Sequence, residues 1–116
     1  MRDYRLYLED ILEAIKNIEK YTKGINAKKL KDNSLIRDAV IRNLEIIGEA
    51  VKHIPLSLKK KYPLIEWKKI SGLRDILAHE YFGVDLGILW DIISNKLPAL
   101  KKETKAILKK IKNKIS

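Results

Sequence analysis

Apolar residues recur along most of this chain at steps of three and four, the spacing of one face of an α-helix. The clearest example is the run Tyr4, Tyr7, Leu8, Ile11 and Leu12. No segment alternates between apolar and polar residues at the period of two that a half-buried strand requires. The pattern therefore predicts an all-α protein, an antiparallel helical bundle of four to five main helices. These helices are expected over residues 2–22, 34–52, 63–81, 85–97 and 98–111.

Local signals indicate where the helices begin and end. Ser34 can cap the second helix, and Leu35 would open its buried stripe. Pro63 suits the first turn of the third helix, whereas Pro98 either kinks the fourth helix or starts a new one. His53 falls in the last turn of the second helix, where a structural role is favoured over catalysis. Between the helices we expect a short helical turn or loop over 26–33 and a basic connector over 55–63.

The whole chain, residues 1–116, is predicted to form a single domain, because its length suits one core better than two. Its formal net charge is +10, and a basic C-terminal segment begins at about residue 101. This segment carries seven lysines and only one acid, Glu103. Two interpretations stay open: a solvated lysine-rich helix face, which composition alone favours, or a surface that contacts phosphate groups.

The chain has no cysteine, no stretch long and apolar enough to cross a bilayer, and no signal-peptide pattern at its start. A cytoplasmic protein without membrane association is therefore expected. With two histidines and no cysteine, the sequence offers no recognisable metal site, and we expect no cofactor.

The segment 74–81 concentrates the groups that could carry chemistry. On a helix, Arg74 and His79 lie about 140° apart, and Asp75 lies four residues before His79. Arginine can donate two hydrogen bonds to a phosphate, and histidine can act as acid or base near neutral pH. Asp75 is placed to hydrogen-bond the imidazole. The arrangement suits phosphodiester cleavage without a metal, although spacing alone favours the structural alternative of a surface ion pair and a helix-end histidine.

A single histidine is a poor complement for RNA cleavage through the 2′-hydroxyl, since that reaction needs both a base and an acid. A two-fold homodimer with this segment at its axis would supply both groups.

Residues 74–81 read Arg-x4-His-x-Tyr, which resembles the signature of the HEPN-domain ribonuclease toxins of the HepT type. Residues 38–50, DAVIRNLEIIGEA, are similar to the long-helix pattern of the same family. So are Tyr62 and Pro63 with Trp67, and the segments 84–90 and 97–98. Several independent segments therefore occur in the order the family requires.

The resemblance implies a HEPN fold, a two-fold homodimer and metal-independent endoribonuclease activity toward an RNA substrate. Arg74 and His79 correspond to the catalytic pair, with Asp75 in support. Family members are toxins paired with a nucleotidyltransferase antitoxin of the MntA type, which neutralises them by transferring AMP to the motif tyrosine. Tyr81 is the matching position, and a higher oligomer with the antitoxin is left open.

Two alternatives remain at this point. The chain could be a non-catalytic binding subunit of a minimal nucleotidyltransferase, since it has only one plausible catalytic histidine. A weaker alternative is a general RNA-binding module that uses the lysine-rich tail.

Overall fold

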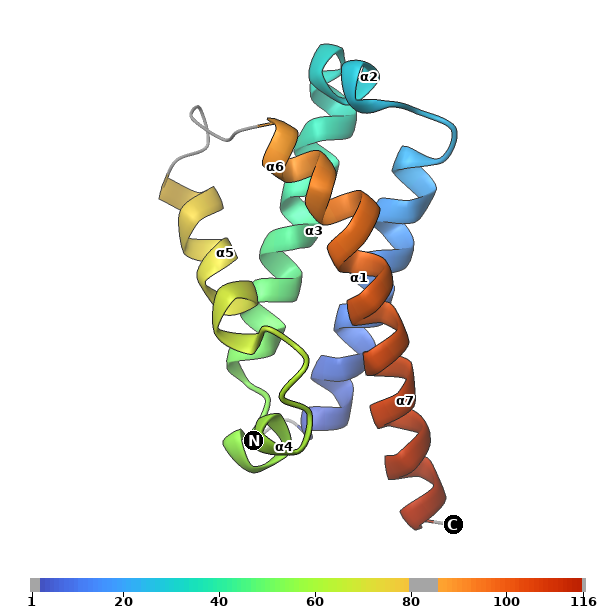
Figure 1. Cartoon of the computed structure of the whole chain (residues 1–116), viewed down its shortest axis with the longest axis vertical. Helices are drawn as coiled ribbons and strands as arrows, with labels where there is room; N and C mark the ends of the chain where they lie inside the picture. The colour runs from blue at the N-terminus through green and yellow to red at the C-terminus, as the bar shows by residue number, and fades with distance from the viewer. Residues whose placement is uncertain (1–2, 80–85, 116) are drawn as a thin grey trace.

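The computed structural model describes residues 3–79 and 86–115, with side chains over 3–73 and 86–112. Every regular element in these ranges is helical, so the predicted all-α class is confirmed (Figure 1). The elements are α1 (Tyr4–Thr22), α2 (Ala27–Asp32), α3 (Ser34–Lys52), α4 (Leu56–Lys61), α5 (Trp67–His79), α6 (Leu86–Asp91), the π-helical turn η2 (Ile92–Lys96) and α7 (Leu97–Ile115).

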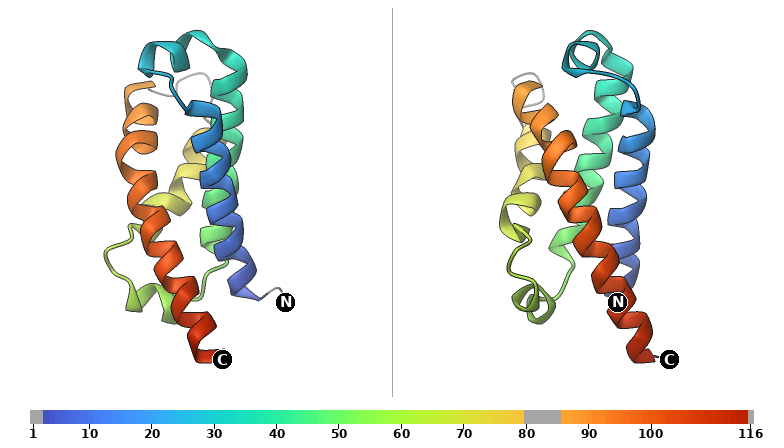
Figure 2. Two further views of the ribbon diagram at one scale, coloured as in Figure 1. Left: turned by 90° about the vertical axis from the view of Figure 1, so that its right-hand side faces the viewer. Right: turned by 45° about the vertical axis from the view of Figure 1, so that its right-hand side comes forward.

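Four long rods make an antiparallel bundle, as predicted. Helix α3 lies between α1 and α5, and α7 packs against α1. Helix α6 continues through η2 into α7, so these three elements form the fourth rod (Figure 2). The short helices lie at opposite ends: α2 is at the upper end of Figure 1 with α6, and α4 is at the lower end with both termini.

The core contains the apolar positions at three- and four-residue spacing on α1, α3 and α7. Burying such side chains supplies most of the favourable free energy of folding, at roughly 25 cal/mol per Å² of apolar surface. The largest fully buried apolar side chains are Leu8, Ile11, Ile15, Ile18, Leu30, Leu44, Ile47, Leu89, Ile107, Val40 and Val51.

Two predictions about the start of α3 are wrong. Asn33, not Ser34, is its N-cap, because the Asn33 side chain accepts a hydrogen bond of 3.1 Å from the backbone N–H of Ile36. Leu35 is 81% exposed rather than buried. Position 35 lies about 180° around the helix from Leu44, so it faces away from the core.

The predicted connector 55–63 contains a helix, α4, which begins after Pro55. Pro63 does not open the next helix, since α5 starts at Trp67. A turn intervenes, in which the backbone N–H of Ile65 donates to the carbonyl of Tyr62 at 3.2 Å. The Trp67 Nε1 donates to the same carbonyl at 3.0 Å, which ties the start of α5 to this turn.

Pro98 sits just after the π-helical turn η2, at the second residue of α7. A proline inside an α-helix lacks an N–H and its ring collides with the carbonyl four residues earlier. The wider π turn relieves that collision. The sequence predicted either a kink or a new helix at Pro98. The structure has a continuous rod there, with one widened turn before the proline.

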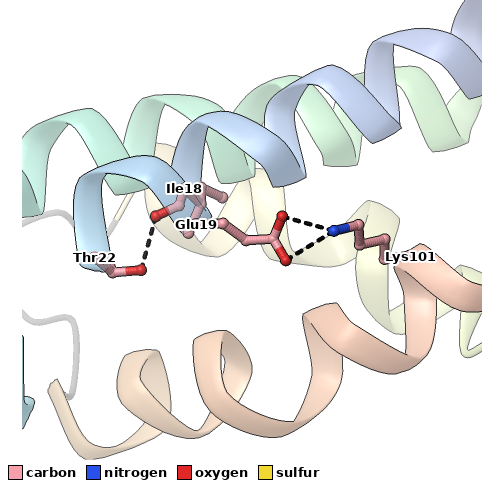
Figure 3. Close-up of polar contacts among 4 residues, drawn as sticks. All are labelled: Ile18, Glu19, Thr22 and Lys101. Atoms are coloured by element: carbon pink, nitrogen blue, oxygen red, sulfur yellow. Dashed lines mark hydrogen bonds and ion pairs between the residues drawn. The ribbon is translucent and has the colours of Figure 1, made fainter. Parts of the chain in front are cut away.

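One basic residue of the C-terminal segment has a structural role. Lys101 Nζ lies 2.9 Å and 3.1 Å from the two carboxylate oxygens of Glu19, which joins α7 to α1 (Figure 3). The first lysine of the segment is therefore neutralised within the fold.

Thr104 on α7 is fully buried, and its hydroxyl has no hydrogen-bond partner in the part of the chain that the structure describes. Burial of an unpaired hydroxyl costs about 1–3 kcal/mol. Thr104→Val, which keeps the side-chain shape, should raise the free energy of unfolding by about 1 kcal/mol, measured by urea denaturation.

Thr22 provides the matched control, because its hydroxyl donates to the carbonyl of Ile18 at 2.7 Å (Figure 3). Thr22→Val should lower the free energy of unfolding or leave it unchanged. A lower stability for Thr104→Val would show that its hydroxyl is satisfied after all.

Candidate functional site

Helix α5 carries the predicted site in its last two turns. Arg74, Asp75 and His79 all lie on this helix, and His79 is its final described residue. Their backbone is helical, as predicted, so the geometric relations between positions 74, 75 and 79 stand. Tyr81, the predicted last residue of the third helix, lies outside the described residues, as does residue 85, the predicted first residue of the fourth.

The lower part of α5 is fixed to the bundle by packing and by ion pairs. Ile70 and Leu73 pack partly buried against the core. Glu66, just before the helix, lies 2.8 Å from Lys69 Nζ and 3.5 Å from Lys96 Nζ on η2. The hydrogen bond and charge of Lys69, with a smaller contribution from Lys96, hold the pKa of the Glu66 carboxyl below its usual value.

An apolar cavity of about 440 Å³ lies between α3, α5, η2 and α7. Its wall includes Leu44, Ile47, Ile70, Leu73 and Leu97. Charged side chains stand among the lining only as Glu66, Lys69, Lys96 and Glu103. The described lining carries no histidine or hydroxyl nucleophile, so this cavity offers no rival set of catalytic groups.

The second histidine lies far from α5's upper end. His53 follows α3 at the lower end of the bundle, whereas α5 ends with His79 near α6 at the upper end (Figure 1). The His53 ring stacks on Tyr7 with ring centres 4.6 Å apart, and its Nε2 lies 3.5 Å from Glu49 Oε1. The backbone N–H of His53 donates hydrogen bonds to carbonyls of α3, so the predicted structural role is confirmed. The side chain stacks on an aromatic ring and does not cap the helix.

Helix α5 is 13 residues long, so its last residue, His79, lies roughly 18 Å along the bundle from its start, which is the end nearer His53. His53 therefore cannot join His79 at one phosphate within a single copy of the chain.

Residues 11–107 match the model of the HepT-like family, whose description is "Ribonuclease HepT-like". The chain belongs to the HepT-like ribonuclease family. The resemblance drawn from the motif is thereby confirmed, together with the all-α, HEPN-like fold class.

Named relatives agree with this assignment. A "Probable ribonuclease HepT" of Thermococcus cleftensis is 45% identical over 100 residues, which are 86% of this chain and 91% of that protein. A "Putative RNase" of Caldanaerobacter subterraneus is 42% identical over 112 residues, 97% of this chain and 100% of the relative.

A longer relative also matches. The "Gamma-glutamylcyclotransferase and putative RNase" of Methanocaldococcus jannaschii is 44% identical over 114 residues, which are 97% of this chain. The chain spans about half of that protein, 51% of its length. No solved structure gives a significant match to the chain.

Within the described ranges, no helix is both long and apolar enough to span a membrane.

The structure also groups lysines that the sequence analysis left in separate segments. Lys59 and Lys60 of α4, in the predicted connector, line one surface hollow with Lys68 and Lys69 of α5. Sequence reasoning missed this group because the two pairs belong to different helices, and the charge density of 59–61 was its only signal.

Proposed function

We propose that this protein is the toxin of a toxin–antitoxin pair and a metal-independent endoribonuclease. The observation that carries the proposal is the Arg74-x4-His79-x-Tyr81 motif, whose Arg74 and His79 lie in the last two turns of α5, in a chain of the HepT-like ribonuclease family. The substrate is RNA in the cytoplasm. A partner nucleotidyltransferase of the MntA type neutralises the toxin by adenylylating Tyr81.

The chemistry follows from the three residues of α5. His79 takes the proton of the RNA 2′-hydroxyl, and the 2′ oxygen attacks the adjacent phosphorus. Arg74 donates hydrogen bonds to the non-bridging oxygens, where negative charge builds up in the transition state. Asp75 orients the imidazole. The bond from phosphorus to the 5′ oxygen breaks, that oxygen takes a proton from a second imidazole, and a 2′,3′-cyclic phosphate remains.

The proposal is tested by incubating the purified protein with RNA in EDTA and mapping the product ends. We expect cleavage that persists in EDTA and leaves 2′,3′-cyclic phosphate and 5′-hydroxyl ends. Products with 3′-hydroxyl ends, or cleavage abolished by EDTA and restored by a divalent ion, would contradict the mechanism. An inactive free protein that binds the nucleotidyltransferase tightly would favour the non-catalytic subunit instead.

The second imidazole is that of a partner copy in a two-fold homodimer. The position of His53 supports this part of the proposal: it lies at the opposite end of the bundle, so one copy offers a single imidazole at α5's last turn. Leu35 is 81% exposed and Ile88 on α6 is 62% exposed. Their helices, α3 and α6, reach the end of the bundle where α5 terminates (Figure 1), and the proposed homodimer would cover these two side chains.

The dimer makes a direct prediction for the double variant Leu35→Glu/Ile88→Glu. Carboxylates at these positions would have to be buried in the interface, so the variant should sediment as a monomer and lose cleavage. Leu64→Glu is the matched control, since Leu64 is 87% exposed at the lower end, and it should stay dimeric and active. A wild-type protein that sediments as a monomer while cleaving RNA would reject the composite site.

A further inference from the structure

A shallow hollow is lined by residues of α4 and the start of α5. These segments lie toward the lower end of the bundle in Figure 1, away from α5's last turn. Lys59, Lys60, Lys68 and Lys69 line this hollow, which we call the lysine hollow. Among the described residues, Glu66 is the single acid in its lining. Four cations around one concave surface create a positive potential that attracts anions.

The positive charge of the lysine hollow is only partly neutralised. Glu66 is already shared between Lys69 and Lys96. Among the described residues, no carboxylate lies within ion-pair distance of Lys59, Lys60 or Lys68. Burial lowers the pKa of the Lys59 amino group, because partial desolvation penalises its charged form. An anion bound in the hollow would offset that penalty.

The lining also includes apolar side chains. Leu56, Ile65 and Trp67 contribute to the lysine hollow; Leu56 is 66% exposed, whereas Ile65 and Trp67 are buried beneath the surface. Lysines beside an exposed apolar side chain suit a single-stranded nucleic acid, with phosphates on the lysines and an unpaired base against Leu56. A duplex keeps its bases stacked inside and would leave Leu56 without a contact.

The basic surface continues toward the end of α7. Lys110 Nζ lies 5.5 Å from the centre of the Tyr62 ring, in the turn that follows α4. The lysine-rich C-terminal segment thus comes to the same end of the bundle as α4. Of the two interpretations of that segment, contact with phosphate is the one that this juxtaposition supports.

Helix α5 connects the lysine hollow to the motif. Positions 68, 71, 75 and 79 follow at steps of three, four and four, so they lie along one side of the helix. Lys68 and Ser71 line the hollow, whereas positions 75 and 79 belong to the motif. Eleven residues separate the ends of this row, or about 16 Å at 1.5 Å per residue. One extended RNA strand lying along α5 could contact both regions.

We propose that the lysine hollow is a second contact site for the RNA substrate, which holds single-stranded phosphates about 16 Å from the cleaved bond. The inference rests on the proposed function, since it assigns a binding surface to the same substrate. It predicts that long single strands are preferred over short ones.

The test compares two triple variants that remove the same charge. Lys59→Ala/Lys60→Ala/Lys68→Ala removes the three lysines of the hollow that have no carboxylate partner among the described residues. Lys16→Ala/Lys20→Ala/Lys23→Ala removes exposed lysines on and next to α1. Binding of a 2′-O-methyl single strand, which cannot be cleaved, is followed by fluorescence anisotropy over a salt series. The hollow variant should bind the strand about tenfold more weakly. The slope of log K against log salt concentration should become shallower by about 2, since each phosphate contact contributes about 0.7.

The control variant should bind as the wild type does. Equal weakening by the two variants would overturn the proposal, because net charge alone would then explain binding. Equal loss of binding to a duplex of the same length would overturn the single-strand assignment. In cleavage assays, kcat/KM for the long strand should fall about tenfold in the hollow variant, while kcat/KM for a dinucleotide stays unchanged.

These readouts separate this inference from the proposed function. A wild type that cleaves RNA, with both triple variants equal to it, rejects the lysine hollow alone. A wild type that binds the strand through the hollow but cleaves no RNA rejects the nuclease and keeps the binding site.

Discussion

His79→Ala should lower the rate of RNA cleavage by about 10²–10⁴-fold, the usual contribution of a positioned acid or base. In a two-fold dimer this substitution removes both imidazoles at once, so the upper part of that range is expected. Single-turnover cleavage of a labelled RNA measures the effect on the chemical step.

Arg74→Ala should lower the rate of RNA cleavage by about 10²–10³-fold, because the transition state loses hydrogen bonds to its charged oxygens. Arg74→Lys should recover only part of this loss, since an ammonium group cannot donate in the paired geometry of a guanidinium. Substrate binding by both variants should weaken far less than cleavage.

His53→Ala is the matched control for the histidine. Its ring stacks on Tyr7 at the lower end of the bundle, so its removal should leave cleavage unchanged. Full activity in His79→Ala and Arg74→Ala would refute the assignment of the site, and loss of activity in His53→Ala alone would move the site to the other end.

Tyr81→Phe should abolish transfer of AMP to this chain by the proposed partner, a nucleotidyltransferase of the MntA type. Incubation of the wild type with ATP, Mg²⁺ and that enzyme should add AMP and suppress cleavage. The added group places bulk and negative charge two residues from His79, where it would repel the RNA phosphate. Intact-protein mass spectrometry measures the modification, and a cleavage assay on the same sample measures its effect.

The Tyr81→Phe protein should still cleave RNA and should escape neutralisation. Tyr21→Phe serves as the control, since Tyr21 lies on α1, and it should be modified like the wild type. Undiminished labelling of Tyr81→Phe would place the modification on another residue.

Local regularities of the chain were enough to predict its long helices, although not the short helix α4. The steps of three and four on α1 identify Leu8, Ile11 and Ile15 as core residues, and all three are fully buried. This works because a helix repeats its faces every 3.6 residues, so the pattern reports burial without knowledge of the partner. Gly24, with a φ of +75°, marks the end of α1 for an equally local reason.

Predictions failed where two local signals competed. Ser34 and Asn33 are both good caps, and the sequence does not say which side chain reaches the free N–H groups. Pro63 is compatible with both a turn and a first helical turn, and the Trp67 hydrogen bond to Tyr62 accompanies the turn. Leu35 was predicted to be buried, but it lies on the side of α3 that faces away from the core.

The motif can be recognised from the sequence because Arg74, Asp75 and His79 belong to one helix, whose geometry sets their relative positions. Contacts between distant segments were decided by packing alone. Packing places His53 at the far end from His79, pairs Lys101 with Glu19, and brings the lysines of α4 beside those of α5. Periodicity describes each helix separately, whereas these contacts depend on how the helices are arranged around a shared core.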